Sequence, residues 1–297
     1  MRSMLLSIMF CLISSVIWGD SVSWADLVEN SSDGLVYQKF QTMPFTGTVA
    51  ATTDNPIQRL YKNGFKHGAW VEFNSNGLVK TKSKFENGKI QRKVGFKNGN
   101  ETIEEKYDYH ESGQLETKTS YKDGLENGPF ERYYENGQLE TNGNFKDGLP
   151  IGLVEVYYKS GQLHKKVNVK DGEPHGLAEQ YHENGQLAGK VVYRDGNWHG
   201  LFERFYENGQ FETKTSYKNG LENGLQEQYY ESGQLETKVN YKDGKAHGLA
   251  EQYYKSGQVS ERRNYNDGER HGLEEQFNED GSLKSSTTYQ NGAILLD

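Results

Sequence analysis

Glycine recurs along this chain in three series with a strict interval of 24 residues, and this periodicity limits the possible folds. In the first series each glycine follows Asn or Ser, and its members are Gly113, Gly137, Gly161, Gly185, Gly209, Gly233, Gly257 and Gly281. The second series, mostly Asp-Gly, comprises Gly124, Gly148, Gly172, Gly196, Gly220, Gly244, Gly268 and Gly292. The third comprises Gly128, Gly152, Gly176, Gly200, Gly224, Gly248 and Gly272. A fixed period of this length indicates a repeat protein, in which each unit packs mainly on its neighbours.

One repeat unit, between Gly176 and Gly200, has the pattern of a β-hairpin. A six-residue run ends at His182, and Asn184-Gly185 follows as a tight turn, because Asn-Gly tolerates the positive φ angles of hairpin turns. The next run alternates and places four residues on one face, namely Leu187, Gly189, Val191 and Tyr193. Two strands and two turns fill the unit and leave no room for a helix.

Such hairpins have to stack, because a lone hairpin buries too little surface to be stable in water. At about 4.8 Å per strand, each unit advances the sheet by about 10 Å. Only 33% of residues are hydrophobic, which disfavours a thick two-layer core, whereas 20 tyrosines and 13 phenylalanines are too many for a disordered chain. The sequence therefore predicts an all-β fold, an elongated single-sheet solenoid of stacked 24-residue β-hairpins.

The repeat array is expected over residues 60–297, as about nine units, with an irregularity at residues 88–112. There the phase breaks by about a dozen residues, and Phe96–Gly99 resembles an extra half unit. Residues 26–59 precede the array and are predicted to form an N-terminal cap segment.

Residues 1–25 have the pattern of a secretory signal peptide. Arg2 supplies the positive charge, Met4–Ile17 is nearly uninterrupted apolar sequence, and Ser23-Trp24-Ala25 fits a cleavage site after Ala25. The apolar stretch is short for a membrane span. We therefore expect export to the periplasm or the extracellular space, with an uncleaved N-terminal anchor as the alternative. Cys11 is the one cysteine, so cleavage would leave no thiol.

Three apolar columns recur in phase with the glycines. The first is always aromatic: Phe73, Tyr133, Tyr157, Tyr181, Phe205, Tyr229, Tyr253 and Phe277. The second lies early in the second strand: Leu115, Leu139, Leu163, Leu187, Phe211, Leu235, Val259 and Leu283. The third ends that strand: Tyr121, Phe145, Val169, Tyr193, Tyr217, Tyr241, Tyr265 and Tyr289. We interpret the three columns as the hydrophobic spine of the sheet. The alternative is an exposed aromatic ladder that binds a partner.

The unit that runs from Gly128 to Leu139, Gly-Pro-Phe-Glu-Arg-Tyr-Tyr-Glu-Asn-Gly-Gln-Leu, resembles the variant MORN repeat. The resemblance covers about Leu60 to Gly292, and chains with such arrays are often grouped as YwqK-family antitoxin-like proteins. Asp33–Tyr37 and Pro44–Gly47 look like the short cap of many bacterial members. The resemblance implies binding or assembly.

Two polar columns contain residue types that can bind metals or act as catalytic acids and bases. The histidines before turn glycines are His67, His175, His199, His247 and His271. Equivalent residues about 10 Å apart do not reach one zinc ion, so we interpret them as turn residues. The carboxylates Glu131, Glu155, Glu179, Glu203, Glu227, Glu251 and Glu275 occupy equivalent surroundings, so no pair is singled out as acid and base. We expect a ladder balanced by Lys and Arg, no enzyme activity, no metal and no cofactor.

The formal net charge of -8, with Lys and Glu interspersed, disfavours nucleic acid and specific membrane-lipid partners. A second aromatic series lies one residue beyond the first, with His182 and Asn278 in the same slot. By alternation it would face away from the first series, and exposed tyrosines are favoured at interfaces. The candidate partner-binding surface is therefore Tyr134, Tyr158, Tyr206, Tyr230 and Tyr254. Support of a thin sheet by aromatic stacking is the alternative role.

We therefore expect an exported, non-enzymatic protein-binding or scaffold module, for which a protein partner is favoured and a glycan is possible. The alternative is an antitoxin or immunity-like protein that neutralises a specific toxin. A cell-envelope hydrolase is a third hypothesis, from a different class.

Overall fold

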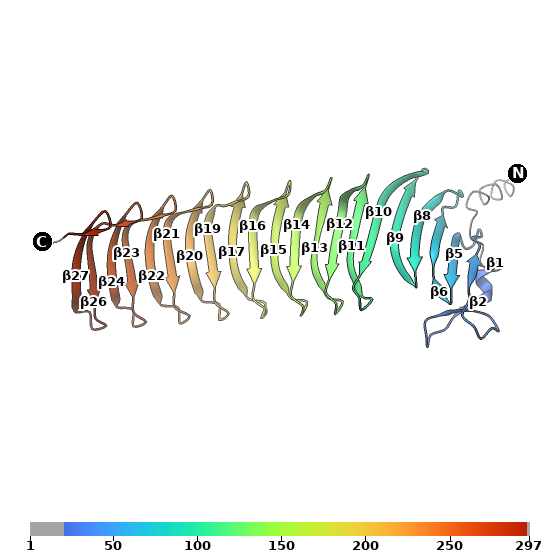
Figure 1. The fold of residues 1–297 in the computed structure, drawn as a ribbon, viewed down its shortest axis with the longest axis horizontal. Coiled ribbons are helices and arrows are strands. Elements are labelled where there is room, and N and C mark those ends of the chain that lie inside the picture. The colour runs from blue at the N-terminus through green and yellow to red at the C-terminus, as the bar shows by residue number, and fades with distance from the viewer. Residues whose placement is uncertain (1–20, 296–297) are drawn as a thin grey trace. The chain divides into compact units, whose positions relative to one another are not determined.

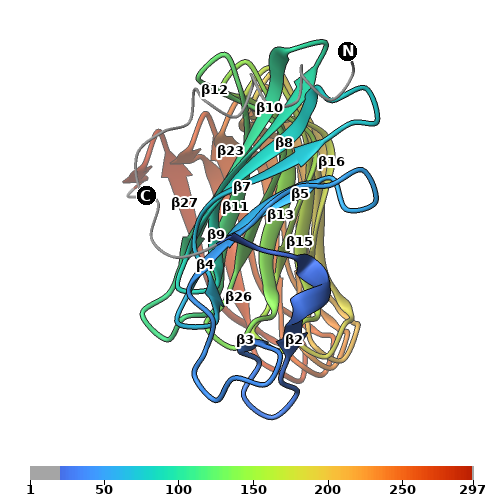
Figure 2. The same ribbon diagram turned by 90° about the vertical axis from the view of Figure 1, so that its right-hand side faces the viewer.

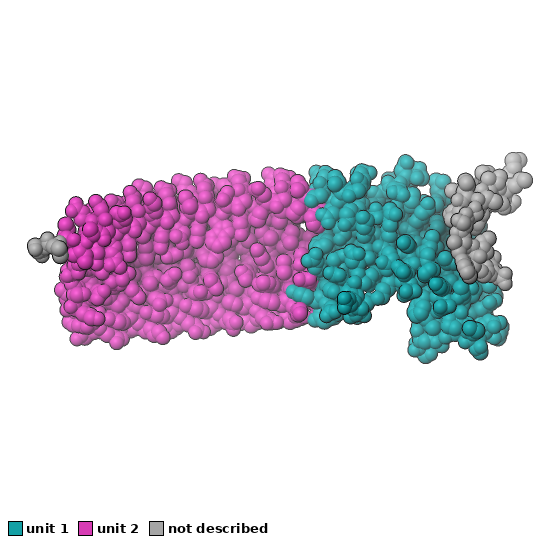
Figure 3. All heavy atoms as spheres, viewed as in Figure 1, with its two compact units in different colours: residues 1–137, 146–148 teal, residues 138–145, 149–297 magenta. Residues whose placement is uncertain are grey.

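The computed structural model describes residues 21–295, so the predicted signal segment up to residue 20 lies outside the described residues. The chain divides into two compact units, which are described separately (Figure 3). Unit 1 extends to Gly137 and includes Lys146–Gly148. Unit 2 contains Gln138–Phe145 and everything from Leu149 onward. Within residues 21–295 the one helical element is a three-residue turn at Trp24–Asp26, and none of the helices described there could cross a membrane.

Both units consist of β-strands that follow one another in chain order (Figure 1). The strands of unit 1 are β1 (Ser21–Val22), β2 (Leu27–Glu29), β3 (Val36–Gln38), β4 (Gly47–Val49), β5 (Ile57–Lys62), β6 (Phe65–Lys66), β7 (Gly68–Phe73), β8 (Val79–Glu86), β9 (Lys89–Lys97), β10 (Asn100–Tyr109), β11 (Leu115–Lys122) and β12 (Leu125–Tyr133). Most of β13 (Leu139–Lys146) belongs to unit 2.

The remaining strands of unit 2 are β14 (Leu149–Tyr157), β15 (Leu163–Lys170), β16 (Glu173–Tyr181), β17 (Leu187–Arg194), β18 (Asn197–Trp198), β19 (Gly200–Phe205), β20 (Phe211–Lys218), β21 (Leu221–Tyr229), β22 (Leu235–Lys242), β23 (Lys245–Tyr253), β24 (Val259–Asn266), β25 (Glu269–Arg270), β26 (Gly272–Phe277), β27 (Leu283–Gln290) and β28 (Ala293–Ile294). Consecutive long strands pair antiparallel, so the predicted all-β sheet of stacked hairpins is confirmed.

The two kinds of turn differ in backbone conformation. In the Asp195-Gly196 turn both residues have positive φ, 49° and 73°, as hairpin turns with the type I′ geometry require. In the Asn184-Gly185 turn only the glycine does, with φ of 86°. There the Asn184 side chain accepts a hydrogen bond from the backbone N–H of Gln186 at 2.9 Å. Asn in the first glycine series is therefore selected for its side-chain bond rather than for a left-handed backbone.

The irregularity at residues 88–112 is an extra strand. Two strands, β9 and β10, lie between Gly88 and Gly113, where a regular unit has one. Lys82 lies opposite Val94, Val94 opposite Glu104, and Glu104 opposite Tyr121, so Lys82 and Tyr121 share a face. The repeat counterpart of Lys82 is Lys118, which is three residues before Tyr121 and therefore on the other face. One extra strand thus inverts the faces of every later hairpin in unit 1 relative to β7 and β8.

The predicted hydrophobic spine divides between the two faces of the sheet, which corrects the interpretation of the three columns. Tyr181 lies opposite Leu187 after a register shift at Gln180, whereas Tyr193 lies opposite Gly176. We call the face with Tyr181 the ladder face. The face with Tyr193, on which the buried Ala178 lies opposite the buried Val191, is called the valine face. The bulge moves Leu187 out of the simple alternation that would have placed it beside Val191.

Near the C-terminal end of unit 2, the valine face carries charged side chains in place of uncharged ones. In positions where earlier units have Thr237, Val239 and Ala250, the chain has Glu261, Arg263 and Glu274. A guanidinium nitrogen of Arg263 pairs with the Glu261 carboxylate, and the Arg263 Nε lies 3.7 Å from the Glu274 Oε2. Arg270 also reaches Glu274 at 3.2 Å. The side chains of both glutamates are about nine-tenths buried, so this is a desolvated ion network where the preceding unit has small, uncharged side chains.

The most buried apolar cluster lies in the cap. Val36, Phe45, Val49 and Tyr61 form it, and Val22, Leu27 and Trp70 pack against it. Strand β1 pairs in parallel with β4, and the Arg59 guanidinium lies 4.3 Å from the centre of the Trp24 ring. Strands β2 and β3 form a separate small hairpin beside these strands (Figure 2). Residues Ser21–Ala25, which cleavage after Ala25 would remove, therefore belong to the folded cap.

Candidate partner-binding surfaces

The second tyrosine series lies at the strand ends, where each tyrosine directly follows the first strand of its hairpin. All five side chains are half-buried, and four of the hydroxyls donate to a backbone carbonyl 23 residues further on. The 2.8 Å bonds run from Tyr158 to Tyr181, from Tyr206 to Tyr229, from Tyr230 to Tyr253 and from Tyr254 to Phe277. Tyr134 occupies the equivalent position in unit 1 and is also half-buried. Within unit 2, the bonds of Tyr158, Tyr206, Tyr230 and Tyr254 each connect one hairpin to the next.

Histidine replaces tyrosine in this slot without losing the connection. His182 Nε2 lies 2.9 Å from the carbonyl oxygen of Phe205, and His110 Nε2 lies 2.8 Å from that of Tyr133. In both cases an imidazole N–H replaces the tyrosine O–H and donates to the equivalent carbonyl oxygen of the next hairpin. Burial raises the pKa of Tyr158, Tyr206 and Tyr230, which keeps their hydroxyls protonated as donors. The slot therefore selects a flat side chain that ends in a donor.

The glutamate column forms the expected ladder with basic residues on the ladder face. Lys166 lies opposite Glu179, which lies opposite Lys190, which lies opposite Glu203, and this alternation continues to Glu275. The Lys166 Nζ is 2.5 Å from the Glu179 Oε2, and the Lys190 Nζ is 2.6 Å from the Glu203 Oε2. The hydrogen bond from Lys166 holds the pKa of Glu179 below its usual value.

Tyrosines of the first column donate to the same carboxylates. The Tyr229 hydroxyl lies 2.8 Å from the Glu227 Oε2, and Tyr253 makes the same contact with Glu251. Burial, with the bond to glutamate, raises the pKa of Tyr229 and of Tyr253 to about 12. The first aromatic column is therefore half-buried and hydrogen-bonded to the glutamates of the ladder, which indicates a structural role.

The histidine column does not lie in the turns, which corrects its interpretation as turn residues. His175 and His247 lie inside β16 and β23, and the other three stand at the break between two short strands. The Nδ1 atoms of His67, His199 and His247 are buried without a hydrogen-bond partner, and His247 Nδ1 is 3.7 Å from the Asp267 carboxylate. In the same slot, Asn223 donates to Asp243 at 3.1 Å. In residues 21–295, no group of three or more His, Cys, Asp or Glu side chains is arranged to hold a metal ion.

A row of leucines on the ladder face was not singled out from the sequence. Leu153, Leu177, Leu201, Leu249 and Leu273 directly follow third-series glycines, and they are 42–48% exposed. Their neighbours across the strands include Asn168, Val192, Ser216 and Asn264. Recurrence of Leu after this glycine was a visible signal, but its exposure was not.

The repeat matches the model of the family described as "MORN repeat variant" in nine segments. The segments are 79–98, 105–123, 126–147, 150–171, 174–195, 198–219, 222–243, 246–267 and 270–291, and together they cover more than half of the chain. The chain belongs to the MORN repeat variant family. The predicted resemblance is thereby confirmed, while the antitoxin-like grouping stays a prediction.

Among curated proteins, none matches this MORN-variant chain. Solved structures similar to parts of it include the TcdB2–TccC3 complex, with 11% identity and a TM-score of 0.23 over 79% of this chain. The TcdB2–TccC3–Cdc42 complex has 12% identity and a TM-score of 0.20 over 86% of this chain. The chain spans 18% and 16% of the length of those two chains. A porin-like protein from Bacteroides uniformis has 6% identity and a TM-score of 0.17, with 86% of this chain and 89% of that one covered.

Proposed function

We propose that this MORN-variant protein is an exported, non-enzymatic binding module that docks another protein along the leucine row of its ladder face. The observation that carries the proposal is the leucine that holds the same position in successive hairpins. It is 42–48% exposed in all of them except at Leu225, which is half-buried. Apolar side chains that recur in line on an otherwise charged face are typical of interaction surfaces. The positive Arg2 and the apolar stretch Met4–Ile17 support export.

The tyrosine series is assigned a smaller part of the proposed interface than the leucine row. The hydroxyls of Tyr158, Tyr206, Tyr230 and Tyr254 already donate to the backbone, so only the exposed parts of the rings are available to a partner. The exposed leucine side chains are apolar and are therefore available to pack against a partner. We therefore assign the principal contact to the leucine row and a supporting contact to the tyrosine edge.

The proposal is tested by capture from an envelope extract, followed by identification and purification of the captured protein and measurement of its Kd. Leu201→Asn with Leu249→Asn should weaken binding by tenfold or more, because apolar anchors dominate interfaces. Asn is tolerated on this face, since Asn264 of the neighbouring strand lies opposite Leu249. Leu221→Asn, an exposed leucine outside the row, is the matched control and should leave the Kd unchanged.

A Tyr206→Ala, Tyr230→Ala double variant separates the two surfaces. If it abolishes binding while the leucine variant binds normally, the leucine row is not the docking surface. Fractionation of cells that produce the full chain tests export, and retention in the cytoplasm would contradict that part of the proposal.

A further inference from the structure

Phe40, in the loop after β3, combines two unfavourable features. Its side chain is fully exposed to water, and its backbone has a φ of 67°, in the left-handed region. In residues 21–295 every other non-glycine residue with positive φ is Asn or Asp, the residues that tolerate this conformation. The backbone conformation costs stability, and the exposed ring gains no burial energy that would offset this cost. Such an outlier points to a function that needs the ring.

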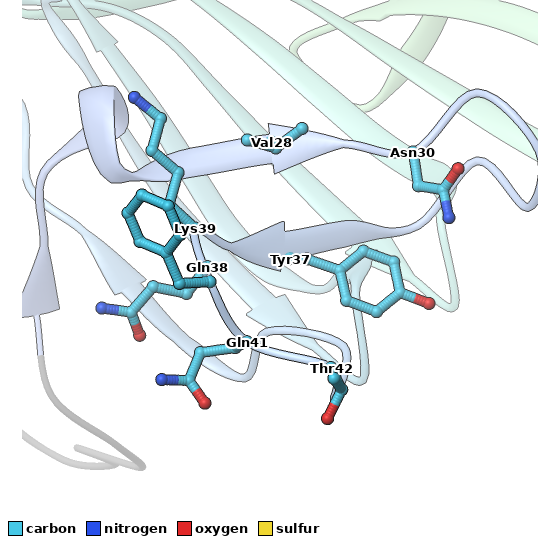
Figure 4. A pocket seen from close by; sticks show the side chains of 8 residues that line it. Val28, Asn30, Tyr37, Gln38, Lys39, Gln41 and Thr42 are labelled. Atoms are coloured by element: carbon cyan, nitrogen blue, oxygen red, sulfur yellow. The ribbon is translucent and has the colours of Figure 1, made fainter.

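Phe40 lies at the rim of a shallow, open hollow of about 760 Å³ between β2, β3 and the loop that follows. Figure 4 labels seven of the other side chains that line it. Two rings line it, Tyr37 and Phe40, together with the amide side chains of Asn30, Gln38 and Gln41. Lys39 is the one charged residue among those that line the hollow. The hollow lies wholly within unit 1.

The lining is held in place by contacts outside the hollow. The Asp33 Oδ2 accepts hydrogen bonds from the Tyr37 hydroxyl at 2.8 Å and from the Asn30 Nδ2 at 3.2 Å. The backbone N–H of Gln41 donates to the carbonyl of Gln38 at 3.0 Å and closes the turn around Phe40. One ring, one amide and the loop backbone are therefore positioned before any ligand arrives, which lowers the entropy cost of binding.

The chemistry of this lining matches a sugar ring with a carboxylate. Aromatic faces pack against the C–H face of a pyranose, and the Gln38 and Gln41 amides each offer a donor and an acceptor to neighbouring hydroxyls, whereas the Asn30 amide is held by Ser32 and Asp33. Lys39 adds a single cation to a hollow that no acidic side chain lines, in a chain whose net charge is -8. A charge-assisted bond from lysine to a carboxylate is stronger than a neutral one.

We propose that this hollow binds an acidic glycan, with Phe40 and Tyr37 stacking on the sugar, the Gln38 and Gln41 amides hydrogen-bonding to its hydroxyls and Lys39 pairing with its carboxylate. This goes beyond the leucine-row proposal and does not depend on it. The two surfaces would allow the cap to hold a polysaccharide while the array binds a protein.

The test is calorimetric titration of the folded chain with hyaluronan hexasaccharide as the acidic probe and chitohexaose as the neutral one. The acidic probe should bind at least tenfold more tightly. Phe40→Gly should weaken this binding at least tenfold while raising the melting temperature, because Gly adopts positive φ without strain. Lys39→Gln should remove the preference for the acidic probe. Phe65→Ala, another exposed aromatic residue of unit 1, should change neither affinity.

Binding of neither glycan, or unchanged affinity in the Phe40→Gly variant, would overturn the proposal. Equal affinities for the two probes would reject the acidic preference. Binding of a Leu- and Phe-rich peptide in place of both glycans would also overturn it, and would assign the hollow to a protein partner.

Discussion

The Tyr206 hydroxyl donates a 2.8 Å hydrogen bond to the backbone carbonyl of Tyr229, 23 residues further along the chain. The same bond recurs one unit later, from Tyr230 to Tyr253. A side chain in one hairpin thus satisfies a main-chain acceptor at the end of the first strand in the next hairpin. This contact joins consecutive hairpins at their strand ends, in addition to the backbone hydrogen bonds between the strands.

Loss of this bond should destabilise the array modestly. Tyr206→Phe removes the hydroxyl and should lower the free energy of unfolding by about 1 kcal/mol. Tyr206→His should restore most of it, because His182 makes the equivalent contact with Phe205. Urea unfolding of the three proteins measures the effect. A phenylalanine variant as stable as the unchanged protein would show that the bond contributes nothing, and a histidine variant no more stable than the phenylalanine variant would show that histidine does not replace it.

The ion network on the valine face should depend on all of its members. Arg263→Val leaves the desolvated Glu261 without its cation and leaves Glu274 with Arg270 alone, and should cost about 3 kcal/mol. The triple change Glu261→Thr, Arg263→Val and Glu274→Ala restores the pattern of Thr237, Val239 and Ala250. It should be neutral or stabilising, since buried ion pairs are often weaker than apolar packing. Denaturant titration decides this, and a triple variant less stable than the single one would contradict it.

Tyrosine ionisation should reveal the bond to the glutamate column. The pKa of Tyr229 is raised to about 12, chiefly by burial and then by its bond to Glu227. Because the folded pKa lies above the unfolded value of 10, this contribution to stability is complete below pH 10 and is lost as the pH rises to about 12. Glu227→Gln should lower the pKa only part of the way, since burial remains. Ultraviolet titration against Tyr229→Phe isolates this group, and a Tyr229 that ionises at pH 10 would refute the assignment.

Processing of the N-terminus should preserve the cap. A chain that begins at Asp26 lacks β1, the packing of Val22 and the contact between Arg59 and Trp24. It should be less stable than a chain that begins at Ser21 by about 2 kcal/mol, from apolar burial and the cation–π contact. Thermal melts compare the two chains. If the chain is exported as proposed, the mass of the protein recovered from the envelope should place its first residue at or before Ser21. A mature chain that starts at Asp26 and melts at the same temperature would remove this expectation.

Local patterns predicted what depends on neighbours along the chain. The glycine series predicted the hairpins, and the Glu column with its intervening Lys residues predicted the charge ladder, because a strand with a fixed period presents one residue type at each height. The extra half unit near Phe96 was also visible as a break of about a dozen residues. Its consequence, the inverted faces on either side of β9, follows only from the pairing of Lys82 through Val94 and Glu104 to Tyr121.

The sequence by itself therefore determined the repeat unit, its turns and the family, since these depend on spacing that any unit carries within its own 24 residues. The tertiary structure decided which residues face water. A bulge at Gln180 moved Leu187 opposite Tyr181, stacking of units turned the second tyrosine series into inter-unit donors, and the leucine row was left exposed. Exposure depends on what the neighbouring strand places alongside a residue. The cap hollow at Phe40 has the same origin, because it requires β2, β3 and their loop to come together.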